Sequence, residues 1–155
     1  MAKSRKVPQK RIINRRARFD YELGDSLVVG LQLTGGETKA LRLGHGQLRG
    51  AYVSVKDNEL WLINAQITSP RGVSISEQDQ LRNRKLLAKR REVDELIAAR
   101  GQGKTIVPTE LITQGRFIKL RIAVGKGKKR YDKRETIKRR EQDREISRQV
   151  SGRAS

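Results

Sequence analysis

The side chains most often used in catalysis and metal binding are few in this chain and poorly placed for either task. The sequence has no cysteine and one histidine, His45, which stands between Gly44 and Gly46 in a predicted turn. A metal site or a nucleophile–base pair needs several such groups close together. We therefore expect His45 to be part of a turn, and we expect the protein to hold no metal and no cofactor.

The acidic pairs and the glycines do not suggest an active site either. The pairs Asp57 with Glu59 and Asp94 with Glu95 fit a tight turn and the surface of a helix better than a metal-dependent nuclease site. Residues 101–104, with two glycines and a lysine, lack the full spacing of a phosphate-binding P-loop. The sequence thus predicts a protein that is not an enzyme.

The most pronounced feature of the composition is its large positive charge. The 155 residues carry a formal net charge of +19, of which +8 lies between Met1 and Arg18 and +7 from Lys126 onward, leaving +4 for the rest. A merely solvated surface mixes the two signs, so this distribution predicts a polyanionic partner: RNA, DNA or an anionic membrane. Without cysteine, and without an apolar run near the N-terminus, we expect a soluble, cytoplasmic protein.

The basic stretch over residues 125–150 is too polar to fold by itself. Its only sizeable apolar side chains are Tyr131, Ile137, Ile146 and Val150. Their burial cannot offset an ordering cost of about 1–2 kcal/mol per residue. Glu135 precedes Arg139 by one helical turn, which mildly favours helix. We expect a tail, residues 125–155, that is disordered in solution and becomes helical against a polyanion.

A second basic cluster follows a mobile N-terminal arm, residues 1–11. Asn14, Arg15, Arg16 and Arg18 come directly after the apolar pair at residues 12–13. Guanidinium groups match phosphate oxygens bidentately, so this cluster is suited to touch phosphates or base edges. The alternative is a solubilising segment that leads into the first strand.

The segments between the two basic ends predict a small, mainly β domain. Alternating apolar residues predict strands over 26–33, 51–56, 59–67, 105–112 and 116–124. Thr34 and Glu37 form a capping box for a helix over 36–43, and Asp57–Asn58 supplies a hairpin turn. Residues 78–100 predict a longer amphipathic helix that covers the sheet.

The last predicted strand has a basic outer face. Arg116, Lys119 and Arg121 point outward with Phe117, an arrangement that suits a nucleic-acid backbone. The basic track continues along the chain through Lys126, Lys128 and Lys129.

Together these elements predict a fold that is mainly β with helices. We expect a small oligonucleotide-binding-type β-barrel over residues 12–124, closed or nearly closed and flanked by two or three helices, followed by the basic C-terminal tail.

Four motifs resemble those of the SsrA-binding protein (SmpB) family over nearly the whole chain. They are NRRAR at 14–18, LTGGETKALRLG at 33–44, RKLL at 84–87 followed by Arg91 and Glu92, and above all GKGKKRYDKRETIK at 125–138. The resemblance implies an adaptor of trans-translation that binds transfer-messenger RNA and enters stalled ribosomes with it. The tail is implied to lie as a helix in the vacant messenger channel. We expect such a protein to act as a monomer and without a membrane.

The resemblance also implies which residues make the contacts. Those implied to touch transfer-messenger RNA are Asn14, Arg15, Arg16, Arg18, Lys39, Arg42, Leu87 and Lys119. Those implied to act on the ribosome are Gly127, Asp132, Lys133 and Arg134, with Tyr131 beside them and Lys138 closing the motif.

Three positions need comment. Leu87 lies on the apolar stripe of the predicted helix, so packing in the core is an equal alternative for it. Val28 stands where the family has a glutamate linked to RNA binding, and Phe19 replaces a frequent histidine. The contact missing at Val28 is lost or supplied elsewhere, for instance by Glu22 or Asp25.

Two other hypotheses remain beside the adaptor. One is a structural ribosomal or ribosome-assembly protein whose basic tail is permanently threaded into RNA. The other is an RNA-modifying or RNA-cleaving enzyme, which the absence of a recognisable active site makes the weakest of the three.

Overall fold

The structure, a computed structural model, describes residues 11–128, 134 and 137–146, and its account of the chain is confined to them. The strands are β1 (Ile12–Ile13), β2 (Tyr21–Leu31), β3 (Gly46–Gln47), β4 (Tyr52–Lys56), β5 (Glu59–Ile63), β6 (Gln66–Ile67), β7 (Arg84–Leu87), β8 (Thr105–Ile112) and β9 (Lys119–Gly127). The helices are α1 (Ala17–Asp20), α2 (Gly35–Arg42), α3 (Glu77–Gln80) and α4 (Arg90–Gly101). The prediction of a mainly β fold with helices is confirmed.

Seven of these strands form one sheet in the order β1-β8-β9-β2-β7-β5-β4, and β3 pairs separately with β6. Each adjacent pair is antiparallel, β2 is the central strand, and β9 is an interior strand with β8 and β2 on its two sides. Within the described residues no ladder joins the edge strands β1 and β4, although β4 packs against β8. The sheet is therefore open, and the predicted closed barrel is not confirmed.

Local sequence signals explain the start of α2 and the β4–β5 hairpin. Thr34 caps α2 by accepting a hydrogen bond from the Glu37 backbone N–H, and the Glu37 carboxylate accepts one from the Thr34 N–H, as the capping box predicts. Asp57 and Asn58 have φ values of 52° and 59°. Positive φ at both positions suits a two-residue hairpin turn, for which short polar side chains are preferred.

The long helix predicted over residues 78–100 is confirmed only in its second half. The structure has the short helix α3, then the strand β7, and a helix only from Arg90. In β7, Leu86 enters the hydrophobic core and its neighbour Leu87 is 50% exposed, the alternation of a strand, while Arg84 is fully buried. Tertiary burial here outweighs the helical spacing of the leucines. The strand predicted over 59–67 is also divided, at Asn64, into β5 and β6.

Two of the strands extend beyond their predicted limits. β2 begins at Tyr21 and contains a bulge between Leu23 and Ser26. β9, predicted over 116–124, begins only at Lys119, so Arg116 and Phe117 lie in the preceding bend and not on the strand, and it continues to Gly127, into the segment expected as tail. A Cβ atom on Gly125 would lie 3.2 Å from Leu23 Cδ2 and 3.2 Å from Tyr21 Cβ. A glycine at 125 therefore lets the two strands stay paired at this level.

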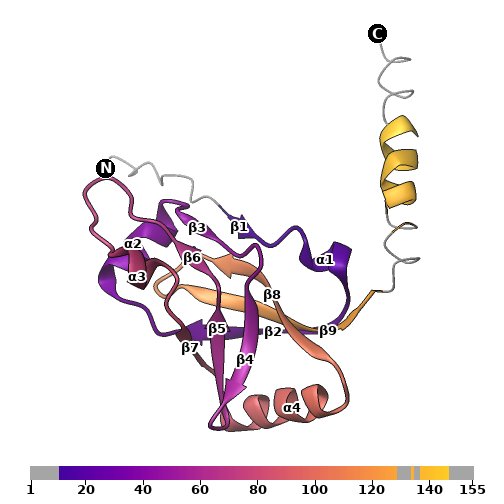
Figure 1. The fold of residues 1–155 in the computed structure, drawn as a ribbon, viewed down its shortest axis with the longest axis horizontal. Coiled ribbons are helices and arrows are strands. Elements are labelled where there is room, and N and C mark those ends of the chain that lie inside the picture. Colours follow the sequence, from indigo (N-terminus) through magenta and orange to yellow (C-terminus); the bar gives the residue numbers. More distant parts are fainter. Residues whose placement is uncertain (1–10, 129–133, 135–136, 147–155) are drawn as a thin grey trace, which may run out of the picture.

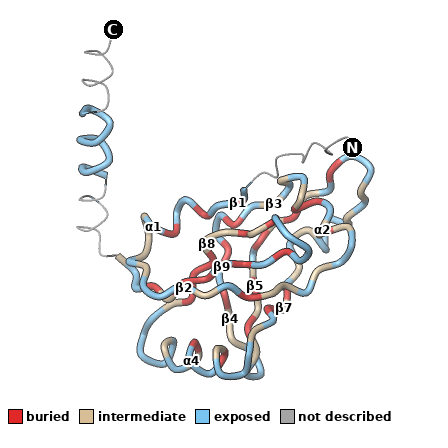
Figure 2. The backbone as a smooth tube through the Cα atoms, turned by 180° about the vertical axis from the view of Figure 1, so that it is seen from behind, coloured by how far each residue is buried: buried red, intermediate tan, exposed pale blue. Residues whose placement is uncertain are grey.

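The core lies between the inner face of the sheet and the helices α2 and α4. Leu41 of α2, Leu96 of α4 and Leu120 of β9 are among its buried members. Figure 1 shows α2 and α3 at one end of the sheet, and α1 at the other end, where β9 finishes. In Figure 2 the buried positions concentrate along the strands, while α4 turns one side to solvent.

Beyond the sheet, the described part of the tail is helical. Residues 137–146 form helical turns in which every residue is exposed, including Ile137 and Ile146 at 43% and 59%. The apolar residues of the described tail therefore contribute nothing to the core. Whether the tail is disordered before it binds RNA stays a prediction.

Candidate nucleic-acid interface

Asn14 anchors the N-terminal basic cluster to the sheet. Its side-chain amide donates a 2.8 Å hydrogen bond to the carbonyl oxygen of Pro108, and its backbone N–H donates to Thr109 O at 2.8 Å. The ladder between β8 and β9 is irregular between Pro108 and Glu110, so the Asn14 amide satisfies a carbonyl beside that irregularity. Asn14 is only 9% exposed. Its geometry is that of a positioning residue for the arginines that follow.

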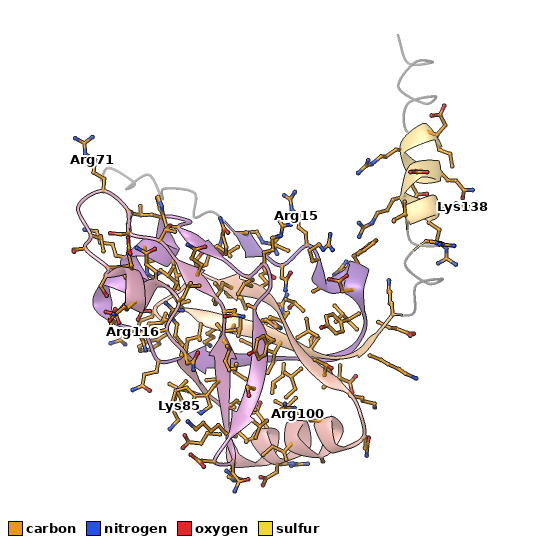
Figure 3. All side chains as sticks on the ribbon, in the orientation of Figure 1. Arg15, Arg71, Lys85, Arg100, Arg116 and Lys138 are labelled. Atoms are coloured by element: carbon orange, nitrogen blue, oxygen red, sulfur yellow. The ribbon has the colours of Figure 1, made fainter. Side chains whose placement is uncertain are left out.

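The three arginines of the cluster lie on or beside α1. Ala17 is buried and fixes the helix to the body, while Arg15, Arg16 and Arg18 are exposed. The Arg16 guanidinium carbon lies 5.2 Å from the centre of the Phe19 ring, and Arg16 Nε lies 3.7 Å from Asp20 Oδ2. These contacts orient Arg16 at the surface. The labelled Arg15 projects away from the body in Figure 3.

The outer face of the sheet brings together residues from three strands. Lys119 of β9 is opposite Gly30 of β2, and Gly30 is opposite Leu87 of β7. Cross-strand partners point to the same side of a sheet, so Lys119 and Leu87 flank the glycine on one face. Leu87 is 50% exposed, which contradicts the alternative that it packs in the core. We call Val28, Leu87, Lys119 and Arg121 the outer sheet face.

Arg121 and Val28 form the next row of this face. Arg121 is the register partner of Val28, which is 41% exposed as predicted. The acid beside Arg121 is Glu110, whose Oε2 lies 3.1 Å from the guanidinium, and Glu110 Oε1 also accepts from Arg11 at 2.7 Å. Glu110 is thus the acid that pairs with Arg121, while Glu22, one of the two expected substitutes, lines the same hollow as Val28 and Glu110.

The arginine cluster and the outer sheet face border the same hollow. Its volume is 1140 Å³, and its lining includes Arg15 and Arg18 from the cluster and Val28 and Arg121 from the face. Arginines separated by more than a hundred positions in the chain therefore border one hollow, together with the acids Glu22 and Glu110, and the excess of cations suits an extended polyanion.

Lys39 and Arg42 lie one helical turn apart on α2, at the end of the sheet where β9 begins. Lys39 is exposed. Arg42 is half-buried, and its guanidinium donates to Thr113 O and Arg116 O, each at 2.9 Å. Both donors thus bind the turn that connects β8 to β9.

A buried ion cluster beneath this surface was not predicted from the sequence. Arg84 donates to Glu37 Oε2 at 2.5 Å and Arg82 binds the same carboxylate, while the Arg84 guanidinium also donates to Ala65 O at 2.7 Å. Burial raises the pKa of Glu37, but hydrogen bonds from Arg82, the Thr34 backbone and Arg84 outweigh it and lower that pKa to about 2. Burial lowers the pKa of Arg84, and the Glu37 carboxylate opposes that effect. The cluster ties α2 to β7.

The remaining predicted residues belong to the end of β9 and the tail. Lys126 and Gly127 are exposed at the end of β9, and the Lys128 N–H donates to Asp20 O at 2.9 Å. Arg134 and Lys138 are exposed and helical. Lys129, Tyr131, Asp132 and Lys133 lie outside the described residues.

The described residues contain neither a metal-binding cluster nor a membrane-spanning helix. Across 11–128, 134 and 137–146, no three His, Cys, Asp or Glu side chains are grouped so that they could hold a metal ion. Among the helices in the same ranges, none is long and apolar enough to cross a membrane.

Comparison with known proteins supports the resemblance seen in the motifs. The family model described as SmpB protein matches residues 11–152. The chain is 44% identical to an SsrA-binding protein of Streptococcus mutans over 138 residues, covering 88% of this chain and 89% of that protein. It is 43% identical to an SsrA-binding protein of a Synechococcus strain over 143 residues, covering 90% and 92%.

A solved structure agrees with these matches. It is described as "tmRNA-SmpB: a journey to the center of the bacterial ribosome", and it superposes with a TM-score of 0.65 at 33% identity, covering 82% of this chain and 94% of that one. A family model that spans nearly the whole chain and relatives above 40% identity lead to one conclusion. The chain belongs to the SmpB, or SsrA-binding protein, family.

Proposed function

We propose that this protein is the RNA-binding adaptor of trans-translation in the cytoplasm: its body binds transfer-messenger RNA and carries it to stalled ribosomes. The observation that carries the proposal is the continuity of the arginine cluster with the outer sheet face around one hollow. The names of the relatives and of the superposed structure give the RNA partner and the ribosome. Without a predicted active site, the chemistry of tagging belongs to the RNA and the ribosome.

Each part of the basic surface has a distinct task in this proposal. Arg15, Arg16 and Arg18 bind phosphates, because guanidinium forks pair bidentately with phosphate oxygens. Lys119 adds a point charge, and Leu87 beside it offers an apolar contact to a sugar or base edge. Asn14 holds the arginine cluster in place through Pro108. Phosphate contacts of this kind make the affinity strongly dependent on salt.

The tail has the second task, on the ribosome. Gly127, Tyr131, Asp132, Lys133, Arg134 and Lys138 act there, while Lys126, Lys128 and Lys129 continue the basic track from the body. A helix with no apolar face to bury gains little from the protein core, so it can be stabilised by an anionic channel instead. Every residue of 137–146 is exposed and none joins the core, although Arg140 and Arg144 border the hollow of the body.

Truncation separates the two tasks. The stop must follow Lys128, because β9 runs to Gly127 and the Lys128 N–H binds Asp20 O. We expect the truncated protein to bind transfer-messenger RNA nearly as tightly as the full chain. We expect peptide tagging on ribosomes stalled on a message without a stop codon to be abolished when the truncated protein replaces the full chain. A large loss of RNA affinity in the correctly folded truncated protein contradicts the proposal.

The alternative of a structural ribosomal protein is tested in cell lysate. Capture of the tagged full chain followed by RNA sequencing should yield one predominant small RNA, together with a minority of ribosomes. Stoichiometric presence on all ribosomes would instead indicate a structural or assembly protein.

A further inference from the structure

Phe117 is the most exposed large apolar side chain in the described part of the chain. Two thirds of its surface, 67%, is open to solvent, while its neighbours Ile118 and Leu120 are 4% and 0% exposed. It lies in the bend between β8 and β9, two residues before Lys119, where β9 begins. An aromatic ring at this place contributes nothing to the core, so its contribution must be sought at the surface.

Arg116 already occupies one side of the ring. Its guanidinium carbon lies 5.5 Å from the ring centre, within the range of a cation–π contact. A guanidinium and an aromatic ring are the two planar groups on which unpaired nucleobases stack in proteins. Figure 3 shows Arg116 at the end of the body that carries α2 and α3.

The turn that presents this pair is held rigidly. Arg42 donates to the carbonyl oxygens of Thr113 and Arg116, so the two bonds close the turn at both ends. Thr113 is only 3% exposed, and Gly115 has a φ of 90°, a conformation that favours glycine. A fixed turn reduces the conformational entropy that is lost when a ligand binds.

The charges around the ring indicate which ligand it meets. Lys39 is exposed on α2, one turn before Arg42, and Lys119 is exposed at the start of β9. Within the described part of the chain, Arg116, Lys119 and Lys39 form no ion pair with an acidic side chain. A ring among uncompensated cations suits a nucleotide, whose base stacks while its phosphate meets the lysines.

We propose that Phe117 and Arg116 form a stacking site for an unpaired nucleobase, and that Arg42 is the positioning residue of that site. The inference rests on the proposed function and adds to it: phosphate contacts place the RNA, and this site recognises a nucleotide that lies outside a helix. Arg42, whose guanidinium is engaged by two carbonyl oxygens, acts through the turn that it holds.

The test measures binding of the full-length protein to transcribed transfer-messenger RNA at several salt concentrations. We expect Phe117→Ala to weaken binding by about 5- to 150-fold, the range for one stacked base. The dependence of log K on log salt should keep its slope, because stacking releases no counterions. Phe117→Trp should bind as tightly as the natural chain, whereas Phe117→Leu should resemble the alanine variant.

Arg42 is tested on the same RNA. Arg42→Ala should weaken binding without changing the salt slope, and should add little when Phe117 is already alanine, because both changes remove one site. A phosphate contact would instead lower the slope by roughly 0.7–0.9 and add fully to the Phe117 change. Circular dichroism of each variant confirms that the fold is retained.

The outcomes are distinguishable. Unchanged binding by Phe117→Ala, or tight binding by Phe117→Leu, overturns the stacking site and leaves the proposed function intact. An effect of Phe117→Ala on ribosome association alone, with normal RNA binding, would assign the ring to another partner and also overturns it. Failure of the natural chain to bind transfer-messenger RNA overturns the proposed function and the stacking site together.

Discussion

Arg84 Nε donates a 2.5 Å hydrogen bond to Glu37 Oε2, and the two side chains are 0% and 1% exposed. Glu37 also caps α2 through the Thr34 N–H, so one carboxylate holds both the start of a helix and a strand 47 residues later. A buried charge of this kind costs little only while its partner is present. The geometry of α2 relative to β7 therefore depends on this pair.

Replacing Glu37 with glutamine should destabilise the fold by about 3 kcal/mol, because it leaves Arg84 buried without an anion. Urea unfolding followed by circular dichroism measures the loss. The matched control is Glu77→Gln in the first turn of α3, an exposed acid whose loss should cost under about 1 kcal/mol. Equal stabilities for the two variants would mean that the pair contributes nothing beyond a surface contact.

The same carboxylate makes stability depend on pH in a predictable window. The pKa of Glu37 is about 2 in the folded chain, against about 4.3 in an unfolded one. Because the folded-state value is lowered, the stabilisation is present above about pH 4.5 and is lost as pH falls toward 2, amounting to about 3 kcal/mol. The difference in unfolding free energy between the natural chain and Glu37→Gln, measured from pH 6 to pH 2, should shrink accordingly. A constant difference would contradict the assignment.

Asn14 and Arg15 are neighbours, but replacing each with alanine should change different quantities: Asn14→Ala the stability of the fold, and Arg15→Ala the salt dependence of RNA binding. Asn14→Ala removes the bond to Pro108 O and should cost about 1–3 kcal/mol of stability. It should weaken RNA binding only by loosening the arginine cluster, and so leave the salt slope unchanged. A reduced salt slope for a stable Asn14→Ala variant would show a direct contact with the RNA.

Arg15→Ala with Arg16→Ala should leave the unfolding free energy nearly unchanged, since both side chains are exposed. Binding to transfer-messenger RNA should weaken, and the salt slope should fall by roughly 1.5 for two lost phosphate contacts. Filter binding across a salt series measures both quantities. An unchanged salt slope would mean that these arginines do not contact phosphates and belong to a solubilising segment before the first strand.

Two glycines at the end of β9 form a matched pair for the tail. Gly125→Ala should destabilise the fold by about 1–3 kcal/mol, because its Cβ would meet Leu23 and Tyr21 at 3.2 Å. Gly127→Ala meets nothing within 4 Å and should leave stability unchanged. If Gly127 acts on the ribosome, the Gly127→Ala variant should support less peptide tagging while its unfolding free energy equals that of the natural chain. Normal tagging by that variant would remove Gly127 from the tail site.

The elements that the sequence predicted correctly are those fixed by neighbouring residues. Thr34 and Glu37 lie three positions apart, and Asp57 and Asn58 are adjacent, so their cap and turn follow from local chemistry. The start of the predicted helix over 78–100 failed for the opposite reason. Arg84 looks like a surface residue until Glu37, remote in sequence, is placed beside it.

The candidate interface also has one part that the sequence predicted and another that only the structure shows. The arginine cluster and the alternation around Lys119 were visible as patterns, whereas the contact between Arg42 and the turn before β9 required the folded chain. Leu87 illustrates the difference: its exposure depends on β7 being a strand that pairs with β2 at Gly30. No local pattern distinguishes that strand from a helical turn.

The position of β9 inside the sheet has a mechanical consequence. The strand carries the tail at one end and is hydrogen-bonded along its length to β8 and β2. Antiparallel ladder bonds run perpendicular to the strand, so a pull on the tail shears many of them at once instead of unzipping them singly. The ladders to β8 and β2 therefore resist together a pull along β9 that is applied through the tail.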